Sequence, residues 1–589
     1  METVKLTIDN KQVEVPKGTT IYKAARKLGI DIPVLCYMEL HDLGVENKPA
    51  GCRICVVEVE GRRNLAPSCA TECAEGMVVK THTTRVINAR RTVMELILSD
   101  HPKDCLTCPK SGRCDLQDMA IKLGIREIPG QEYAEMSTYK KDFSPSIIRD
   151  VDKCIMCRRC ETMCNEVQTV GALSAVNRGF MAVVAPAFEQ DLEKSPCTYC
   201  GQCVAVCPTG ALTEVDHTTK VIRAIADPTK TVLVQTAPAV RAALGEEFGM
   251  KPGTLVTGKM VAALRQIGFD YVFDTDFAAD LTIMEEGTEL LDRLSRFLNG
   301  DKNVKLPILT SCCPGWVNFF EHNFTDMLDV PSSAKSPQQM FGALAKTYYA
   351  KKIDVDPAKM VCVSIMPCTA KKFEADRPAM RDSGYKDVDY VLTTRELAIM
   401  IKQAGIEFAD LPNEGFDTIM GKSTGAGVIF GATGGVMEAA LRTVYEIVTG
   451  REVPFKDLNI TPVRGLEGVK EANVKIEKAL PEYKFLEGVE VKCAVAHGLA
   501  NARTLMDSVK QGKADYHFIE IMACPGGCLG GGEQPIPTTP EIRQKRVEAN
   551  YEVDMSMSLR KSHENPEVIG LYKEFLGQPY GHMSHKLLH

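Results

Sequence analysis

The chain has 589 residues, which is too long for one ordinary hydrophobic core and predicts several domains. Its hydrophobic fraction of 44% and charged fraction of 25% are typical of a soluble globular protein, and no apolar stretch is long enough to span a bilayer. The formal net charge of −7, without any basic stripe, argues against nucleic acid as a partner.

The first residues start directly into an alternating strand pattern and lack the basic-then-apolar design of a signal peptide, so we expect a cytoplasmic protein. The 23 cysteines are the unusual feature, with sixteen before residue 210 and seven after residue 310. Cytosolic thiols stay reduced and bind metal more often than they form disulfides. The spacing of the cysteines therefore indicates which groups they hold.

The first segment, residues 1–80, has the pattern of a small mixed sheet crossed by one helix. Residues 4–15 alternate apolar and polar side chains around a turn-forming Asp-Asn pair, which predicts a hairpin. Residues 20–28 predict a short helix and residues 56–59 another strand. This pattern is typical of a ferredoxin-type β-grasp domain.

Four cysteines in this domain, Cys36, Cys52, Cys55 and Cys69, have the long-range spacing of a 2Fe–2S ligand set. Fifteen residues separate the first from the second, so the first loop is longer than in plant-type ferredoxins. A structural zinc site with four cysteines is the alternative. The remaining Cys73 is predicted to be an ordinary buried thiol.

The next segment, residues 81–140, contains three cysteines and a histidine in close succession: His101, Cys105, Cys108 and Cys114. Imidazole can replace thiolate on iron, and the lack of a fourth cysteine favours His101 as a ligand of a 4Fe–4S cluster. One alternative makes this histidine a helix-end residue. Zinc bound by three cysteines and one histidine is the competing chemistry.

Residues 141–226 contain two copies of the bacterial ferredoxin run, with cysteines separated by two, two and three residues. In that fold the fourth cysteine of each run binds the other cluster. Two 4Fe–4S clusters are therefore predicted, one held by Cys154, Cys157, Cys160 and Cys207, the other by Cys197, Cys200, Cys203 and Cys164. Neither zinc nor disulfides explain the repeated run.

These clusters predict an electron relay between a surface donor and a buried site, but they do not name the reaction. The same modules could feed a quinone, a molybdenum cofactor or a flavin. A molybdenum-dependent formate dehydrogenase could share the first 220 residues, but it would not need the later cysteine motifs.

The remaining residues, 227–589, alternate strand-like and helix-like runs, which predicts an α/β domain with functional residues on loops at strand ends. The predicted strands are 231–235, 361–365 and 493–496, and the predicted helices are 239–248 and 501–509. Two cysteines inside the strand-like runs, Cys362 and Cys493, are predicted to be buried packing residues.

Three cysteine motifs follow strand-like runs in this domain: T-S-C-C-P-G-W at 310–316, M-P-C-T-A-K-K-F-E at 366–374 and M-A-C-P-G-G-C-L-G-G-G at 522–532. Each is rich in glycine, proline or small residues, which let the backbone approach a bulky group closely. Four thiolates from three distant segments make a buried 4Fe–4S site plausible.

These motifs resemble the three signatures of the iron-only (FeFe) hydrogenases, and the whole chain resembles the modular clostridial type and the large subunits of NAD(P)-linked hydrogenases. The resemblance implies a large hydrogenase domain with a C-terminal small-subunit-like tail. It also implies an H-cluster, which is a 4Fe–4S cluster joined through a cysteine to a two-iron unit carrying carbonyl, cyanide and a bridging dithiolate. By motif, Cys313, Cys368, Cys524 and Cys528 hold the 4Fe–4S part, and Cys528 bridges to the two-iron unit.

The resemblance also implies residues around the two-iron unit. Cyanide ligands carry negative charge and need hydrogen-bond donors in a dry pocket, and methionines can form soft apolar walls. Plain core filling is the alternative for each residue. The residues implied are Lys371, Ser336, the backbone near Ala237 and Pro238, and the side chains of Met366 and Met522.

A proton route is the last requirement, and the resemblance implies that it runs through Cys312, Glu286, Ser332 and Glu289 to Arg293 at its mouth. A thiol has a pKa nearer neutrality than a hydroxyl and suits acid–base work. Glu286 and Glu289 lie three apart on a helix-like stretch and share one face. The alternative is that these glutamates form a solvated helix face.

Three functions are compatible with these motifs: a hydrogenase acting on H2 and protons, an electron-transfer subunit without chemistry of its own, and a hydrogen-sensing or cluster-assembly relative. The thiol of Cys312, which a sensor would be expected to lack, favours the enzyme. No G-x-G-x-x-G follows a strand, so nicotinamide or flavin would bind on another chain.

We therefore expect flavin- and NAD(P)-binding partner subunits and small ferredoxin-like subunits, with or without ferredoxin as a further partner (electron bifurcation). A stand-alone ferredoxin hydrogenase is the alternative. The predicted cofactors are one 2Fe–2S cluster, three accessory 4Fe–4S clusters and the H-cluster.

Overall fold

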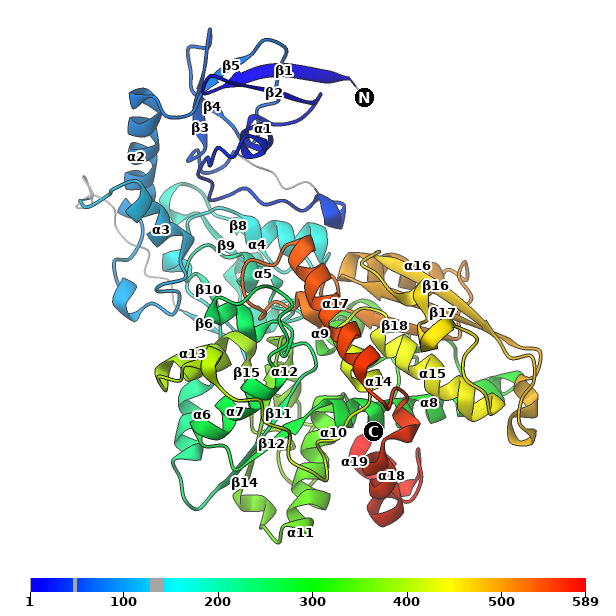
Figure 1. Ribbon diagram of the computed structural model, residues 1–589. Coiled ribbons are helices and arrows are strands. Elements are labelled where there is room, and N and C mark those ends of the chain that lie inside the picture. The colour runs from blue at the N-terminus through cyan, green and yellow to red at the C-terminus, as the bar shows by residue number, and fades with distance from the viewer. Residues whose placement is uncertain (1, 46–49, 128–140) are drawn as a thin grey trace. The chain divides into compact units, whose positions relative to one another are not determined.

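The computed structural model describes residues 2–45, 50–127 and 141–589, which form two compact units (Figure 1). The first unit comprises Met1–Val167, Gly171–Ser195 and Val206–Thr213, and the second comprises Gln168–Val170, Pro196–Ala205 and Glu214–His589. The end of the segment predicted at 81–140 lies outside the described residues. None of the described helices is both long and apolar enough to cross a bilayer.

The first unit begins with a five-stranded sheet in the order β2-β1-β5-β3-β4. Its hairpin, helix and strand agree with the sequence prediction, and Thr20 caps the helix by accepting a hydrogen bond from the backbone N–H of Lys23. The elements are β1 (Thr3–Ile8), β2 (Lys11–Pro16), α1 (Ile21–Lys27), β3 (Val56–Val59), β4 (Ala66–Pro67) and β5 (Val78–Lys80).

The rest of this unit consists of short elements that present cysteine-bearing loops. A long helix, α2 (Thr84–Ser99), starts with Thr83 as its cap and is followed by α3 (Asp115–Lys122). Two small sheets follow, formed by β6 (Asp142–Phe143), β7 (Ile147–Arg149) and β10 (Leu212–Glu214), and by β8 (Ser174–Val176) and β9 (Val183–Ala185). A single-turn helix, α4 (Arg159–Thr162), lies between them in the chain.

The second unit contains a parallel sheet in the order β12-β11-β14-β15. Its strands are nearly continuous runs of buried apolar residues, as expected for a parallel sheet covered on both faces. The strands are β11 (Thr231–Thr236), β12 (Tyr271–Asp274), β14 (Met360–Met366) and β15 (Tyr390–Thr393), and among the helices packed on them are α6 (Thr218–Ile225), α7 (Thr257–Ile267) and α13 (Thr394–Gln403).

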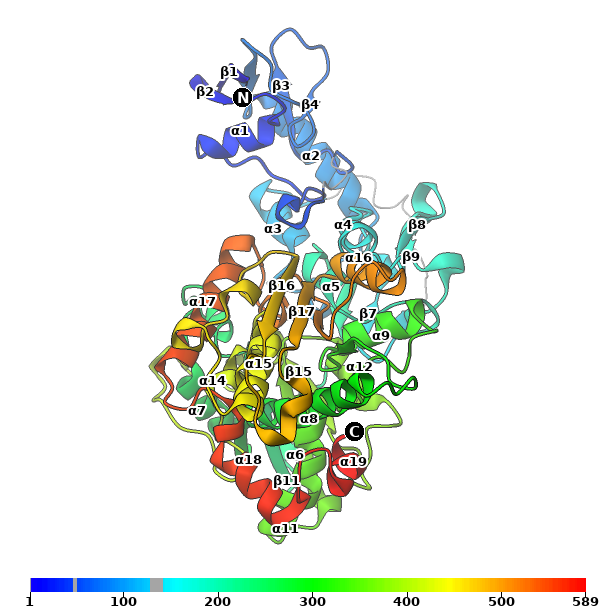
Figure 2. The same cartoon turned by 90° about the vertical axis from the view of Figure 1, so that its right-hand side faces the viewer.

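A second sheet of the same unit has the order β13-β18-β17-β16, with an antiparallel pair only at the β16 edge (Figure 2). The edge strand β16 (Val469–Lys475) alternates exposed and buried residues, whereas β17 (Glu490–His497) and β18 (Phe518–Met522) are mostly buried. β13 (Ile308–Leu309) is short. Helices packed on this sheet are α8 (Asp276–Leu298), α9 (Pro314–Asn323), α15 (Gly435–Thr449) and α16 (Leu499–Lys510), whereas α10 (Pro337–Leu344) and α12 (Ala370–Asp376) pack in the core of the first sheet.

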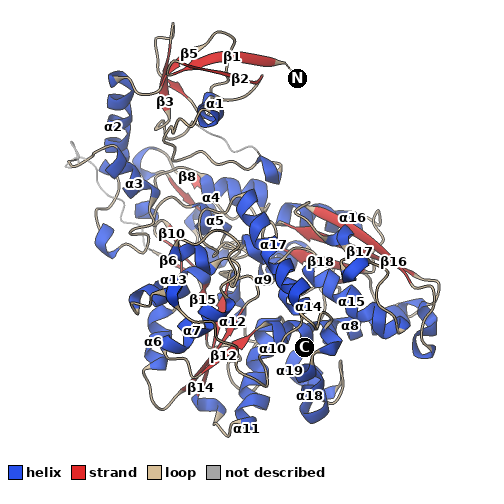
Figure 3. Cartoon of the chain, viewed as in Figure 1, coloured by secondary structure: helices blue, strands red, loops and turns tan. Residues whose placement is uncertain are grey.

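The chain ends in three helices, α17 (Pro540–Ser556), α18 (Pro566–Leu571) and α19 (His582–Leu588), which Figure 3 shows in blue. This segment is tied to helix α8 through the fully buried carboxylate of Glu285. That carboxylate accepts hydrogen bonds from the Tyr572 hydroxyl at 2.5 Å, the Tyr580 backbone N–H at 2.7 Å and the Ser584 hydroxyl at 2.9 Å.

One sequence prediction in this unit is wrong. Residues 239–248, predicted to form a helix, form turns followed by the 3₁₀ helix η9 (Leu244–Phe248). Tertiary contacts override helix propensity here, because the buried guanidinium of Arg241 is held by two aspartates, Asp274 and Asp276. The three strands and the other helix predicted for this domain are confirmed, and Cys362 and Cys493 are buried, as predicted.

Candidate functional site

A cavity in the second unit lies where the loops after β13, β14 and β18 converge. It encloses about 740 Å³ of empty space. All five cysteines of the three motifs line it: the four predicted cluster ligands at positions 313, 368, 524 and 528, and Cys312. Its other walls include Ala237, Pro238, Met366, Lys371 and Met522. The cavity therefore brings together nearly all of the residues that the resemblance implied for the cofactor.

The four cysteines are buried thiols whose sulfurs face the cavity lining. Burial raises the pKa of each thiol, that of Cys528 to about 12, so that bare sulfurs there stay protonated at neutral pH. A metal ion reverses this preference, because a coordinating thiol is deprotonated outright. The backbone N–H of Ala523 already points at the Cys313 sulfur, at 3.4 Å, as a donor to a ligating thiolate would.

Two glycines let the backbone turn tightly beside these sulfurs. Gly527 has a φ of +85°, and a Cβ built on it would lie 2.8 Å from the sulfur of Met522 and 2.7 Å from the backbone nitrogen of Thr433. A Cβ on Gly531 would lie 2.2 Å from the carbonyl oxygen of Pro367. The close packing of these ligand loops therefore requires glycine at both positions.

The polar side of the cavity is built around Lys371. Its ammonium donates to the Cys312 carbonyl at 3.0 Å and to the buried carboxylate of Glu374 at 3.0 Å. Gln338, which the sequence analysis missed, also lines the cavity and donates to the Lys371 carbonyl at 3.2 Å. Its place in the K-S-P-Q-Q stretch was the available signal. Phe430 is a further lining residue without any sequence signal.

Two expected donors differ from the prediction. The Ser336 hydroxyl donates to Glu374 at 2.9 Å and is not among the lining residues, because the start of helix α10 turns it toward that carboxylate. The backbone N–H of Ala237 donates to the Ile365 carbonyl at 3.0 Å, so the sheet already uses it, and Pro238 has no N–H. The amide N–H groups of Gln338 are likewise taken, by the Lys371 carbonyl and by Glu374, so Lys371 is the donor that remains among these residues.

The residues predicted for the proton route lie one after another in space beside the cavity. Glu286 and Glu289 are both 1% exposed on helix α8, and the Ser332 hydroxyl donates to Glu289 at 2.8 Å. Arg293 donates to Glu289 at 2.6 Å, and its side chain is 15% exposed, so the far end of this row reaches solvent. Glu286 lies close enough to Cys312 for its charge to raise the pKa of that thiol, after burial, the larger cause.

Glu286 has the environment of a carboxyl that exchanges protons near neutral pH. Burial raises its pKa to about 7, against the opposing hydrogen bonds from Ser311. Its second oxygen, Oε2, has no hydrogen-bond partner among the residues that the structure describes, although it is fully buried. A neutral carboxyl with one oxygen unoccupied is suited to accept and pass on a proton.

This raised pKa predicts a pH-dependent stability effect for Glu286→Gln. The unfolded carboxyl titrates near 4.5 and the folded one near 7, so the folded state binds more protons between these values and the wild type loses stability as pH rises through them. Glutamine does not titrate and so avoids this loss of folding stability, which amounts to about 3 kcal/mol at pH values above both pKa values. We expect the variant's thermal midpoint to exceed that of the wild type more at about pH 9 than at about pH 5. A difference that does not grow with pH would contradict the raised pKa.

In the first unit the four cysteines of the N-terminal domain converge on one point. The Cys55 and Cys69 sulfurs are 3.3 Å apart, and the Cys36 sulfur interacts with those of Cys52 and Cys69. Sharing of protons among them lowers the pKa of Cys36 and Cys55, the latter to about 6. Cys73 is buried, as predicted, and burial raises its pKa to about 11.

His101 is 9% exposed, and burial lowers its pKa to about 4, so the imidazole is neutral and can act as a ligand. Its Nδ1 has no hydrogen-bond partner in the described part of the chain. Cys114 is buried and interacts electrostatically with Cys108, whereas Cys105 is exposed. The position of His101 also agrees with the alternative of a helix-end residue, since helix α2 ends at Ser99.

The two ferredoxin runs are divided between the units. In the first unit, Cys154, Cys157, Cys160 and Cys207 line one cavity with about 440 Å³ of empty space. Burial raises the pKa of Cys157 to about 12, and the neighbouring sulfurs add to this. Cys197, Cys200 and Cys203 belong to the second unit and Cys164 to the first.

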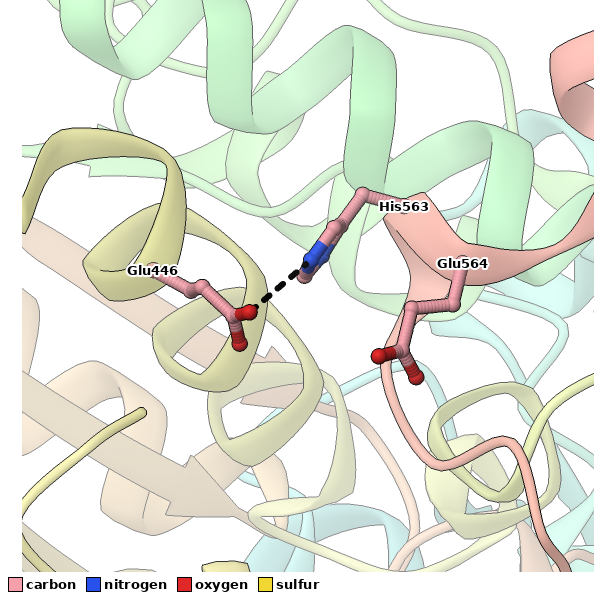
Figure 4. A group of neighbouring side chains, drawn as sticks. All are labelled: Glu446, His563 and Glu564. Atoms are coloured by element: carbon pink, nitrogen blue, oxygen red, sulfur yellow. Dashed lines mark ion pairs between the residues drawn. The ribbon is translucent and has the colours of Figure 1, made fainter. Parts of the chain in front are cut away.

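A separate group of possible metal ligands, Glu446, His563 and Glu564, is drawn in Figure 4. The Lys561 ammonium lies 2.7 Å from Glu446 and 3.0 Å from Glu564, and it also pairs with Glu452. A lysine therefore already supplies the positive charge that these carboxylates require. This group is an ion-pair network that holds the C-terminal segment.

A family model described as iron only hydrogenase large subunit, C-terminal domain, matches residues 230–532, just over half of the chain. The chain belongs to the iron-only hydrogenase family. Other models match the rest of this hydrogenase. Before the catalytic domain, a 2Fe-2S iron-sulfur cluster binding domain matches residues 1–84, an NADH-ubiquinone oxidoreductase-G iron-sulfur binding region matches 90–129, and an NADH-quinone oxidoreductase subunit 3 ferredoxin-like domain matches 144–213. After it, an iron hydrogenase small subunit model matches 540–589.

Two curated relatives extend over the full length of this hydrogenase. The NADP-reducing hydrogenase subunit HndD of Solidesulfovibrio fructosivorans is 61% identical, covering 100% of this chain and 98% of its own. Iron hydrogenase 1 of Clostridium pasteurianum is 40% identical, covering 99% of both. A solved structure of the FeFe-hydrogenase HydA1 from Chlamydomonas reinhardtii has a TM-score of 0.57 and 45% identity, covering 64% of this chain and 98% of its own.

These matches settle the class of enzyme and of cofactor. The protein is a hydrogenase with a multidomain fold, and it binds 2Fe–2S and 4Fe–4S clusters and the H-cluster. The reading as an electron-transfer subunit without its own chemistry is excluded by the matched catalytic domain.

Proposed function

We propose that this hydrogenase interconverts H2 with protons and electrons at the cavity of the second unit. The observation that supports this most directly is the convergence of four cysteines from three loops beside Lys371 and Cys312. Cys313, Cys368, Cys524 and Cys528 would hold the 4Fe–4S part of the H-cluster, and Cys528 would bridge to the two-iron unit. When bound, this cofactor supplies the metal site at which hydrogen reacts.

The accessory clusters are assigned in the same way, each from a group of candidate ligand residues. We assign one 2Fe–2S cluster to the N-terminal domain and three 4Fe–4S clusters to the following two segments, with the domains divided at 1–80, 81–140, 141–226 and 227–589. The 2Fe–2S ligands are Cys36, Cys52, Cys55 and Cys69, and the 4Fe–4S sets are His101 with Cys105, Cys108 and Cys114; Cys154, Cys157, Cys160 and Cys207; and Cys197, Cys200, Cys203 and Cys164.

The protein residues have separate tasks in the reaction. Lys371 places a positive charge on the cavity wall, where anionic ligands of the cofactor would be held, and Gln338 positions it by donating to the Lys371 carbonyl and to Glu374. Met366 and Met522 make that wall apolar and keep water out. Cys312 holds a proton on its sulfur at neutral pH, because burial raises its pKa.

Protons then pass along helix α8. Glu286 takes a proton from, or gives one to, Cys312, and its pKa of about 7 lets it do either near neutrality. The Ser332 hydroxyl donates to Glu289, and Arg293 holds Glu289 at the solvent end. Each residue is buried or nearly so, which limits exchange with solvent to that end.

The electrons are expected to leave through the accessory clusters to partner subunits that bind flavin and NAD(P), in a cytoplasmic complex with small ferredoxin-like subunits and with or without ferredoxin. The full-length similarity to an NADP-reducing hydrogenase subunit supports this choice. Anaerobic purification of the native protein tests it: flavoprotein subunits should co-elute, and H2-dependent reduction of NAD(P) should follow them. A fully active lone chain would contradict it.

A second candidate is a stand-alone ferredoxin hydrogenase. Iron hydrogenase 1 of Clostridium pasteurianum matches over 99% of both chains, and its name includes no NAD(P) partner, which is compatible with this alternative. In that case the purified chain alone should oxidise H2 with ferredoxin and should not require any flavoprotein.

The catalytic assignment itself is tested on anaerobically matured protein. We expect infrared bands of iron-bound carbonyl and cyanide together with exchange between H2 and D2O. Zinc at the four cysteines, or iron without these bands, would overturn the assignment.

His101→Cys tests the histidine ligand. A thiolate in place of a neutral imidazole adds negative charge at the cluster, so the variant should keep a 4Fe–4S cluster with a more negative reduction potential. Redox titration followed by electron paramagnetic resonance measures this potential. An unchanged potential and spectrum would show that His101 is the end of helix α2 and not a ligand.

A further inference from the structure

The loop that carries Cys197, Cys200 and Cys203 packs directly against the catalytic ligand loops within the second unit. A Cβ on Gly532 would lie 2.4 Å from the backbone of Gly201, and a Cβ on Gly201 would lie 2.7 Å from the Thr369 hydroxyl. The side chain of Gln202 donates to the Gly530 carbonyl at 3.0 Å. This contact places one accessory ligand loop beside the catalytic one.

One hydrogen bond across this contact joins residues that adjoin cluster ligands on both sides. The Thr369 hydroxyl donates to the Tyr199 carbonyl at 2.5 Å. Thr369 directly follows Cys368, and Tyr199 directly precedes Cys200. Thr369 is 0% exposed and Tyr199 is 4% exposed, so water does not compete for the bond. Covalent bonds plus this one hydrogen bond therefore connect the two ligand sulfurs.

The contact is held rigidly from the catalytic side. The buried guanidinium of Arg395 donates to the carbonyls of Gly532 and Gln534, both at 3.0 Å, and to Glu533 at 2.6 Å. The other carboxylate oxygen of Glu533 lies 3.4 Å from the Cβ position of Gly201. Such bonding fixes the position of the catalytic loop at the contact.

We propose that Thr369 is a positioning residue for electron transfer, whose hydroxyl couples the accessory cluster held by Cys200 to the catalytic cluster held by Cys368. This inference rests on the proposed function. The competing contact is apolar: a Cβ on Gly315 would lie 3.7 Å from the Cβ of Cys200 and 3.2 Å from that of Ala523. Electron coupling falls off more steeply across a van der Waals gap than along a hydrogen bond, which favours the Thr369 route.

The experiment compares Thr369→Val, which keeps the shape of the side chain and removes the hydroxyl, with Thr369→Ser, which keeps the hydroxyl. Both are made in the full holoenzyme. A laser flash injects an electron into the accessory clusters, and time-resolved infrared absorption follows its arrival at the catalytic centre. Exchange between H2 and D2O, which needs no electron from the accessory clusters, is measured in parallel.

We expect the valine variant to lose transfer rate severalfold with unchanged exchange activity and unchanged cluster spectra, and the serine variant to transfer like the wild type. Unchanged transfer in the valine variant would overturn the inference in favour of the apolar contact. If Thr369→Val and Thr369→Ala both fail to assemble clusters while serine assembles them, the hydroxyl is structural and the inference fails. Absence of exchange in the wild type would instead refute the proposed function.

Discussion

Replacing Cys312 with alanine will leave the iron content unchanged and lower hydrogen turnover at least ~10²-fold, because general acid–base groups contribute that much or more. Cys312 lines the cavity but is not among the four cysteines grouped for the cluster, so its loss should not release metal. The charge of Glu286 raises the pKa of the Cys312 thiol, after burial, and Glu286 accepts hydrogen bonds from the neighbouring residue Ser311, which places the carboxyl next to the Cys312 segment.

A matched control is available in Cys493→Ala. Cys493 is a fully buried thiol in β17, and it belongs to the same apolar cluster that Cys312 packs against. Its loss removes a similar volume without touching the cavity lining. The measurements are iron content, infrared bands and H2 oxidation rate for both variants. Near-normal turnover in Cys312→Ala, or an equal loss in the control, would remove Cys312 from the proton route.

Local patterns in the sequence sufficed wherever neighbouring residues determine the structure. The hairpin of β1 and β2 turns at Asp9 and Asn10, with φ values of 48° and 65°, which is the conformation that such residues tolerate. The cysteine runs were equally informative, because cluster ligands need fixed short spacings. The three catalytic cysteine motifs could be placed at strand ends because each follows a strand-like run in the sequence.

The rest depends on partners that are distant in sequence. Ser336 looked like a donor to the cofactor, but Glu374, which lies 38 residues away, takes its hydroxyl. The stretch that contains Arg241 looked helical, but two aspartates more than thirty residues away hold it in turns. The periodicity of apolar residues carries no information about such pairings, so the residues that surround and orient the cavity lining could not be predicted from the sequence.

Two adjacent glutamates on helix α8 show the same limit and provide the second prediction. Glu285 and Glu286 are both buried, yet they point to different surroundings. Glu285 accepts hydrogen bonds from Tyr572 and Ser584 of the C-terminal segment, whereas Glu286 faces Ser311 near the cavity. The sequence places them on neighbouring positions of one helix and does not distinguish the structural carboxylate from the one proposed to carry protons.

Glu286→Gln will lower hydrogen turnover by ~10²–10⁴-fold while the clusters remain assembled, because an amide of the same shape accepts the Ser311 bonds but cannot exchange a proton. Glu285→Gln is the matched control, one residue away on the same helix and equally buried, and it should reduce stability far more than turnover. Comparable turnover losses in both variants would refute the route through Glu286. Since Glu286→Gln is also expected to raise the thermal midpoint at alkaline pH, a variant that is more stable and nearly inactive would show that this buried carboxyl is kept for proton transfer and at a cost to the fold.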